Sequence, residues 1–161
     1  MAGQSRATPK PAEFRLPAAL LGAWGLYQLL AGLYFIFLRP GFLPEDIRAS
    51  GTSLEAVRSA APGIEAWLQW VFAVLGGQMA AVGVLVMGGA VSIWQGRRPK
   101  RTEVGAYAVA GAFSVVVMSG VNFALVSHFR WLLVAPVILW LAATIFLWRR
   151  ASGSGPDGRR E

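Results

Sequence analysis

The chain has 161 residues and a net charge of +7, with 55% hydrophobic and 14% charged residues. Soluble domains carry roughly 25% charged residues, so this composition excludes an ordinary soluble enzyme and a disordered chain. The chain has no cysteine, which excludes disulfides, thiolate catalysis and cysteine-bound zinc or iron–sulfur clusters. Its hydrophobic residues gather in four long runs with almost no charge, which indicates an integral membrane protein.

Each run is long enough to cross a bilayer core of about 30 Å as an α-helix. The expected spans are residues 17–38, 70–94, 104–127 and 129–148. Helices are preferred to a β-barrel because the runs are continuously apolar and do not alternate with a period of two. We therefore predict an all-α polytopic fold, an antiparallel bundle of four transmembrane helices over 17–148, with disordered tails at 1–16 and 149–161.

The first run also has features of a cleaved signal peptide, because Arg15 precedes it. Its length exceeds the usual 7–15 apolar residues of such a peptide, and no A-x-A-like cleavage site follows. We expect it to stay as the first span, with Pro17 at the helix start, where a missing N–H costs nothing.

The connection at 39–65 is long for a protein of this size and contains helix signals. Thr52-Ser53-Leu54-Glu55 matches a capping box with Thr52 as N-cap, and Pro62-Gly63 ends the pattern. A short amphipathic helix is therefore expected to lie over the outer ends of the bundle. Pro44-Glu45-Asp46 is expected to open a further helical turn. The segment is interpreted either as a shield for the helix ends or as a lid over a ligand or docking surface.

Small residues predict close helix packing in the first three spans, since lipid gives helices no hydrophobic reason to associate. The second span has glycine or alanine on nearly every face, so we expect it at the centre of the bundle. Pro136 lies inside the fourth predicted span and is expected to kink it. Trp24 and Trp140 lie away from the membrane boundaries and are expected to pack together inside, where an indole N–H needs a partner.

Four polar side chains are candidates for a binding site. Gln28 and Gln78 lie at similar depths in the first two spans, and Asn122 and His128 lie near the outer boundary. An unpaired amide in hydrocarbon is costly. One hypothesis is a small polar pocket that opens outward beneath the loop helix. The other is that the glutamines form interhelical hydrogen bonds while Asn122 and His128 satisfy helix ends.

The positive charges give the orientation. Lysine and arginine are concentrated in the two tails and in the 95–103 loop, so both termini are expected in the cytoplasm, in a multi-pass protein of the bacterial inner membrane. The charge is thus a topology signal and not a sign of nucleic-acid binding. Contacts with anionic lipid headgroups are a second interpretation for the basic loop residues Arg97, Arg98, Lys100 and Arg101.

The side chains within and near the predicted spans support few kinds of catalysis, metal binding or proton transfer. No Asp, Glu, Lys or Arg lies within the predicted spans, which argues against proton-coupled transport of the kind found in small multidrug exporters. His128 is the only histidine, so bis-histidine haem and multi-histidine metal sites are not expected, and no catalytic residue or cofactor is predicted. The charged residues expected near the outer boundary have no recognisable motif: Arg39, Glu45, Asp46, Glu65, His128 and Arg130.

The segments Phe42-Leu43-Pro44-Glu45-Asp46 and Trp70–Gly77, with a glycine-rich second span, carry a family resemblance. Together with four short spans and a longer first outer loop, the chain loosely resembles small bacterial four-helix membrane proteins of the DoxX-like class. The resemblance covers about a third of the chain and implies the four-helix membrane fold. It carries no catalytic signature and transfers no functional residue.

Three classes of function follow. The first is a non-enzymatic accessory or interaction module that binds a membrane protein partner or self-associates through the first three spans. The second is a binder or carrier of a small lipophilic molecule or lipid in an outward-facing pocket. The third is a membrane enzyme that uses the outer charged cluster.

Overall fold

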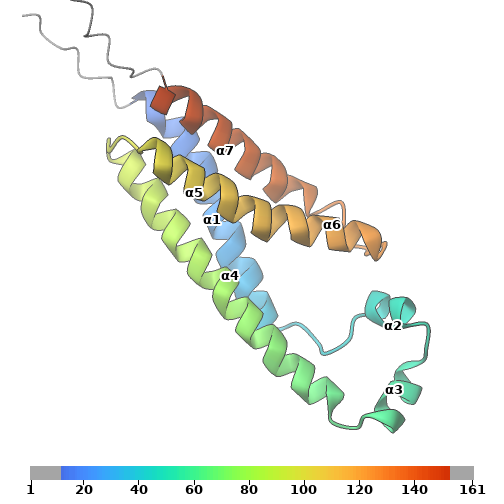
Figure 1. Cartoon of the computed structure of the whole chain (residues 1–161). Helices are drawn as coiled ribbons and strands as arrows, with labels where there is room; N and C mark the ends of the chain where they lie inside the picture. The colour runs from blue at the N-terminus through green and yellow to red at the C-terminus, as the bar shows by residue number, and fades with distance from the viewer. Residues whose placement is uncertain (1–11, 153–161) are drawn as a thin grey trace, which may run out of the picture.

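The computed structural model describes residues 12–152, which form helices joined by turns without any strand (Figure 1). Two short helices, α2 and α3, connect the long helices α1 and α4. The third long helix runs through α5, the π-helical turn η1 and α6. The elements are α1 (Ala12–Phe37), α2 (Pro44–Ser50), α3 (Leu54–Ala60), α4 (Ile64–Trp94), α5 (Arg101–Gly111), η1 (Ala112–Val116), α6 (Val117–Ala124) and α7 (Val134–Ser152).

Four helical segments of the described chain are long and apolar enough to cross a membrane. They are Glu13–Phe37, Ile64–Trp94, Arg101–Ala124 and Val134–Ser152. Large apolar side chains along them face outward; Leu85 and Phe113, for example, are 74% and 75% exposed. The prediction of an all-helical chain with four candidate spans is therefore confirmed.

Glycines bring the backbones of α1 and α4 into direct contact. A Cβ atom added at Gly32 would lie 2.5 Å from the backbone nitrogen of Ala80, and one at Gly83 would lie 2.5 Å from that of Leu29. Gly25 also lies against Gly83, and Gly32 against Gly76, so glycines seven residues apart on each helix face each other. The contacts run in opposite order along the two helices, which makes them antiparallel.

The centre of the structure is α1, not the second span that the sequence predicts. α1 packs along both α4 and α7, and α5 packs along α7. Leu21 and Trp24 of α1 are fully buried, in one core with side chains of the other three long segments. Small residues allow two helices to pack closely, but their presence on a helix face does not mean that another helix packs there. Gly77 and Gly88 of α4, for example, have nothing within 4 Å of an added Cβ.

Trp140 packs against the third long helix just before the π-helical turn η1. Its indole Nε1 donates a hydrogen bond of 3.0 Å to the carbonyl oxygen of Tyr107, and its ring fills the space where Gly111 has no side chain. π-helical turns occur mostly as single-turn bulges inside α-helices, and η1 is one of these. The expected pairing of the two indoles does not supply a partner to Trp24, whose Nε1 is buried without a hydrogen bond.

Both prolines occupy helix positions that differ from the prediction. α1 begins at Ala12, so Pro17 lies inside this helix and residues 12–16 belong to it. α7 begins at Val134 and runs to Ser152, so Pro136 lies in its first turn and residues 149–152 are helical. A proline in the first turn removes no helical hydrogen bond and needs no kink. The remaining tail residues, 1–11 and 153–161, lie outside the described part.

The predicted loop helix also differs in detail. The structure places the N-cap of α3 at Ser53, whose Oγ accepts a hydrogen bond of 3.1 Å from Ala56 N, instead of at Thr52. No residue of α3 is buried, so α3 does not cover the bundle. Of the two short helices, only α2 has a buried residue, Glu45.

The α1–α4 contact predicts opposite outcomes for two glycines of one helix. Gly83→Ala should lower the free energy of unfolding by about 1–3 kcal/mol, because the new methyl group meets backbone atoms that cannot move aside. Gly88→Ala is the matched control and should cause no loss, because its position is open. Thermal unfolding in detergent measures both, and equal stability of the two variants would contradict the interface.

Candidate functional site

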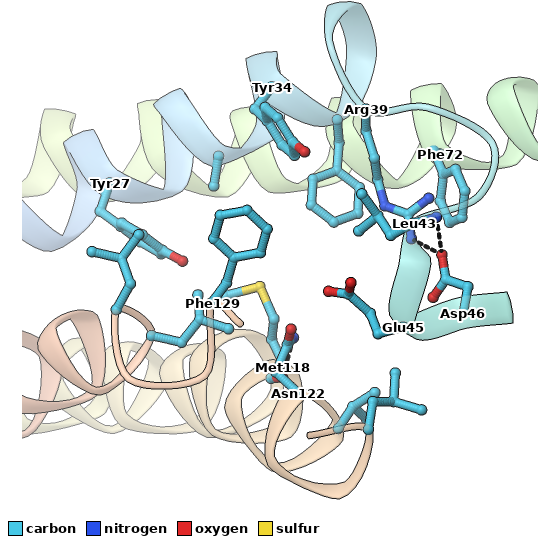
Figure 2. A pocket seen from close by; sticks show the side chains of 16 residues that line it. Tyr27, Tyr34, Arg39, Leu43, Glu45, Asp46, Phe72, Met118, Asn122 and Phe129 are labelled. Carbon is cyan, nitrogen blue, oxygen red and sulfur yellow. Dashed lines mark hydrogen bonds and ion pairs between the residues drawn. The ribbon is translucent and has the colours of Figure 1, made fainter. Parts of the chain in front are cut away.

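A cavity of about 570 Å³ lies between α1 and α6 and is bordered by α2 (Figure 2). Its walls come from α1, α2, α4, α6 and the turn that precedes α7, so it forms where five parts of the chain converge. Most of the lining is apolar, and aromatic rings form much of it. These rings are Tyr27, Tyr34 and Phe35 of α1, Phe72 of α4 and Phe129 of the turn.

Arg39 follows α1 and lines one side of the cavity without a free charge. Its side chain is only 9% exposed, and its Nη2 lies 3.1 Å from Asp46 Oδ2. The guanidinium lies over the Phe72 ring, 3.4 Å from its centroid, and 5.4 Å from that of Phe35. Nη1 donates to the Pro40 carbonyl at 3.0 Å. The Asp46 carboxylate, the Pro40 carbonyl and the faces of the two phenylalanine rings together stabilise the positive charge of Arg39.

The same Asp46 carboxylate fixes the start of α2. Its Oδ2 accepts a hydrogen bond of 2.9 Å from the backbone N–H of Leu43, just before the helix. Pro44 occupies the first helical position, where its missing N–H costs nothing. One carboxylate therefore holds α2 and Arg39 in a fixed relation to each other.

Two further contacts tie α2 to the far wall. Glu45 is 4% exposed, and its Oε1 accepts a hydrogen bond of 2.7 Å from Ser127 Oγ. Arg48 Nη2 donates to the carbonyl oxygens of Leu125 and Val126, at 3.1 and 3.2 Å, just beyond the end of α6. These bonds link segments about 80 residues apart in the chain, so α2 bridges the two sides of the cavity.

Ser127 also stabilises the charged form of Glu45. Its hydroxyl donates to the ionised carboxylate, which lowers the pKa of Glu45 below its usual value; His128 and Arg48 add smaller electrostatic effects in the same direction. Burial opposes this change, because it disfavours the charged form. The hydrogen bond is the larger effect, so Glu45 is a carboxylate at neutral pH.

The structure separates the four predicted polar residues. Asn122 lines the cavity, and its Nδ2 donates to Met118 O at 2.9 Å. His128 is exposed and is not part of the lining. Gln28 is fully buried with neither amide atom hydrogen-bonded, whereas Gln78 is exposed on α4. The interhelical hydrogen bonds expected of the two glutamines are therefore not found among residues 12–152, because equal depth in the membrane does not decide which way each helix face points.

The outer charged residues do not form one cluster. Arg39, Glu45 and Asp46 meet at the cavity. Glu65 instead pairs with Arg58, whose Nε and Nη2 donate at 2.8 and 2.9 Å. Among residues 12–152, no group of three or more His, Asp or Glu is placed to hold a metal ion.

The basic loop at the opposite end is partly occupied by its own contacts. Arg97 makes a bidentate pair with Glu103, with both distances 2.7 Å. Arg101 Nη2 reaches the Ser152 carbonyl at 3.5 Å, while the Arg98 and Lys100 side chains are exposed. Contact of these four residues with anionic lipid stays a prediction.

Comparisons with protein-family models, with curated proteins and with solved structures find no match. The resemblance to DoxX-like proteins stays a hypothesis. The site must therefore be interpreted from its own geometry.

Sequence reasoning named Asn122 and the outer carboxylates but missed the aromatic walls. A signal was present, because Tyr27 and Tyr34 are seven residues apart and so share one face of a helix. The contributions of Phe72 and Phe129 depend on how four helices pack and have no local signature.

The Glu45–Ser127 bond predicts a pH dependence of stability. A carboxylate with a lowered folded-state pKa stabilises the fold above its unfolded pKa, and this contribution is lost as pH falls through the folded-state value. The difference in melting temperature between wild type and Ser127→Ala should be largest above about pH 4.5 and should shrink below it. Thermal scans in detergent across this range measure the difference. A constant difference at every pH would contradict the proposed role of Ser127.

Proposed function

We propose that the protein is an antiparallel four-helix transmembrane bundle of the cell membrane with both termini in the cytoplasm. The four apolar helices support the spanning role. Both described ends of the chain and the basic turn between α4 and α5 lie at one end of the molecule, and α2 and α3 lie at the other (Figure 1). The positive-inside rule assigns the first end to the cytoplasm, which makes the segment with α2 and α3 external.

Within this arrangement, we propose that the protein binds or carries a small lipophilic molecule or lipid. The cavity is the observation that carries the proposal. Protein interiors are close-packed with few voids larger than a water molecule, whereas ligand pockets measure roughly 300–1,000 Å³ and are mostly apolar with a few polar groups. A cavity of about 570 Å³ with aromatic walls and a polar border has both features of a ligand pocket.

The bonds made by α2 support its interpretation as a lid. Asp46, Glu45 and Arg48 connect α2 to both sides of the cavity, although α2 itself is only seven residues long. A segment that only shielded helix ends would need no such directed contacts. The lid is held by polar bonds at the membrane boundary, where water competes for them and allows opening.

The sequence alone favours a different function, a non-enzymatic accessory or interaction module, with the binder as its alternative. The close-packing glycines of α1 and α4 face each other within the chain, so those faces are not available to a partner. Such a partner would have to use the open side of α4 around Gly77 and Gly88. An enzyme is less well supported, because the charged residues do not converge on one reactive centre.

The proposal is tested by native mass spectrometry of protein extracted in a mild detergent from its own membrane. Wild type should retain a molecule of defined mass. Ala31→Trp, which places an indole in the cavity wall, should lose it, while Ala81→Trp, on the exposed side of α4, should keep it. A retained mass that Ala31→Trp does not change would contradict binding in the cavity. A stoichiometric protein without a small molecule would favour the accessory module.

A further inference from the structure

We infer that the ligand is an organic cation: an amphipathic molecule whose positively charged nitrogen or similar head lies beside Glu45 and whose apolar body fills the aromatic cavity. The inference rests on the proposed function and names the class of ligand. It is carried by three observations: a buried carboxylate, the charge balance of the lining and the chemistry of the walls.

The first observation is the position of the Glu45 carboxylate. Figure 2 shows it projecting into the space between α1 and α6, away from the Arg39–Asp46 pair. Oε1 is held by Ser127, and Oε2 has no side-chain partner among residues 12–152. Glu45 makes no ion pair in this part of the chain, where the ion pairs are Arg39–Asp46, Arg58–Glu65 and Arg97–Glu103. A buried carboxylate that makes no direct ion pair is costly, and a cation in the cavity would supply one.

The second observation is the net charge of the lining. One guanidinium, Arg39, and two carboxylates, Glu45 and Asp46, border the cavity, which leaves one net negative charge. Arg39 cannot serve both carboxylates, because Asp46 and the Phe72 ring already hold it. Arg48 and His128 act on Glu45 only through space; both are exposed, and the Arg48 guanidinium is bonded to two carbonyls.

The third observation is that the walls themselves suit a cation. Aromatic faces attract cations through their quadrupole, and aromatic cages recognise quaternary ammonium groups. This cavity already places one cation on its rings, since Arg39 lies over Phe72 and Phe35. Tyr27, Tyr34 and Phe129 offer further rings around the remaining volume. The two carboxylates would repel an anion of the same shape.

The test uses two ions of nearly equal size and shape and opposite charge, tetraphenylphosphonium and tetraphenylborate. Binding to the full chain in maltoside micelles is measured by equilibrium dialysis, with empty micelles as the blank. Tetraphenylphosphonium should bind at one site per chain and more tightly than tetraphenylborate. Glu45→Gln should weaken phosphonium binding by about tenfold or more, because it removes the carboxylate of the cavity lining that makes no ion pair. Glu55→Gln, an identical change on the exposed α3, should have no effect.

The outcomes separate this inference from the proposed function. Equal or tighter binding of tetraphenylborate, binding of neither ion, or an unchanged phosphonium affinity in Glu45→Gln would overturn the cation specificity. The proposed function would still stand if Ala31→Trp removes the molecule retained from the membrane. The comparison of the two ions is made in wild type, so the test remains decisive if Glu45→Gln does not fold.

A lipid headgroup and a free small molecule can both supply such a cation. Short-chain phosphatidylethanolamine and short-chain phosphatidylglycerol, added separately, distinguish these sources. Competition by phosphatidylethanolamine alone would support an aminolipid, and competition by neither would support a free cation. Competition by phosphatidylglycerol alone would overturn the inference.

Discussion

The backbone contact between α1 and α4 is the interaction on which the rest of the structure depends. Lipid surrounds apolar helices as favourably as another helix does, so association requires closer packing than ordinary side chains allow. Gly25 and Gly32 on one helix and Gly76 and Gly83 on the other provide it. This contact commits one face of α1 to α4 and leaves its other faces for α7 and for the cavity.

The division of α1 into two halves explains where the cavity forms. Leu21 and Trp24 in the first half are fully buried in the common core. From Tyr27 onward, the residues of α1 that do not face α4 include those that line the cavity. The long segments thus share a filled core towards the chain ends and surround a cavity at the end with α2, where polar bonds of Asp46, Glu45 and Arg48 take over from apolar packing.

The sequence predicts the helical class and the four apolar segments well, because length and continuous hydrophobicity are local properties. It predicts helix neighbours poorly. Gly76 and Gly77 are equivalent in the sequence, yet the first touches α1 and the second touches nothing within 4 Å of an added Cβ. The site follows the same pattern: Asn122 lies at the cavity as expected, whereas Gln28 and Gln78 face different surroundings. The sequence predicts Glu45 in a helical turn and among the outer charged residues, but not its contact with Ser127, which is 82 residues away.

The π-helical turn η1 sets the rotational register of the helix that contains it. α5, before the turn, packs against α7 through Tyr107 and Gly111, and α6, after it, presents Met118 and Asn122 to the cavity. A π-turn accommodates one residue more than an α-helical turn does, which corresponds to a rotation of about 100°. The indole of Trp140 contacts the helix at Tyr107 and Gly111, just before this turn. The extra residue therefore lies between the part of the helix that packs on α7 and the part that borders the cavity, and it changes which face of α6 meets the cavity relative to a continuous α-helix.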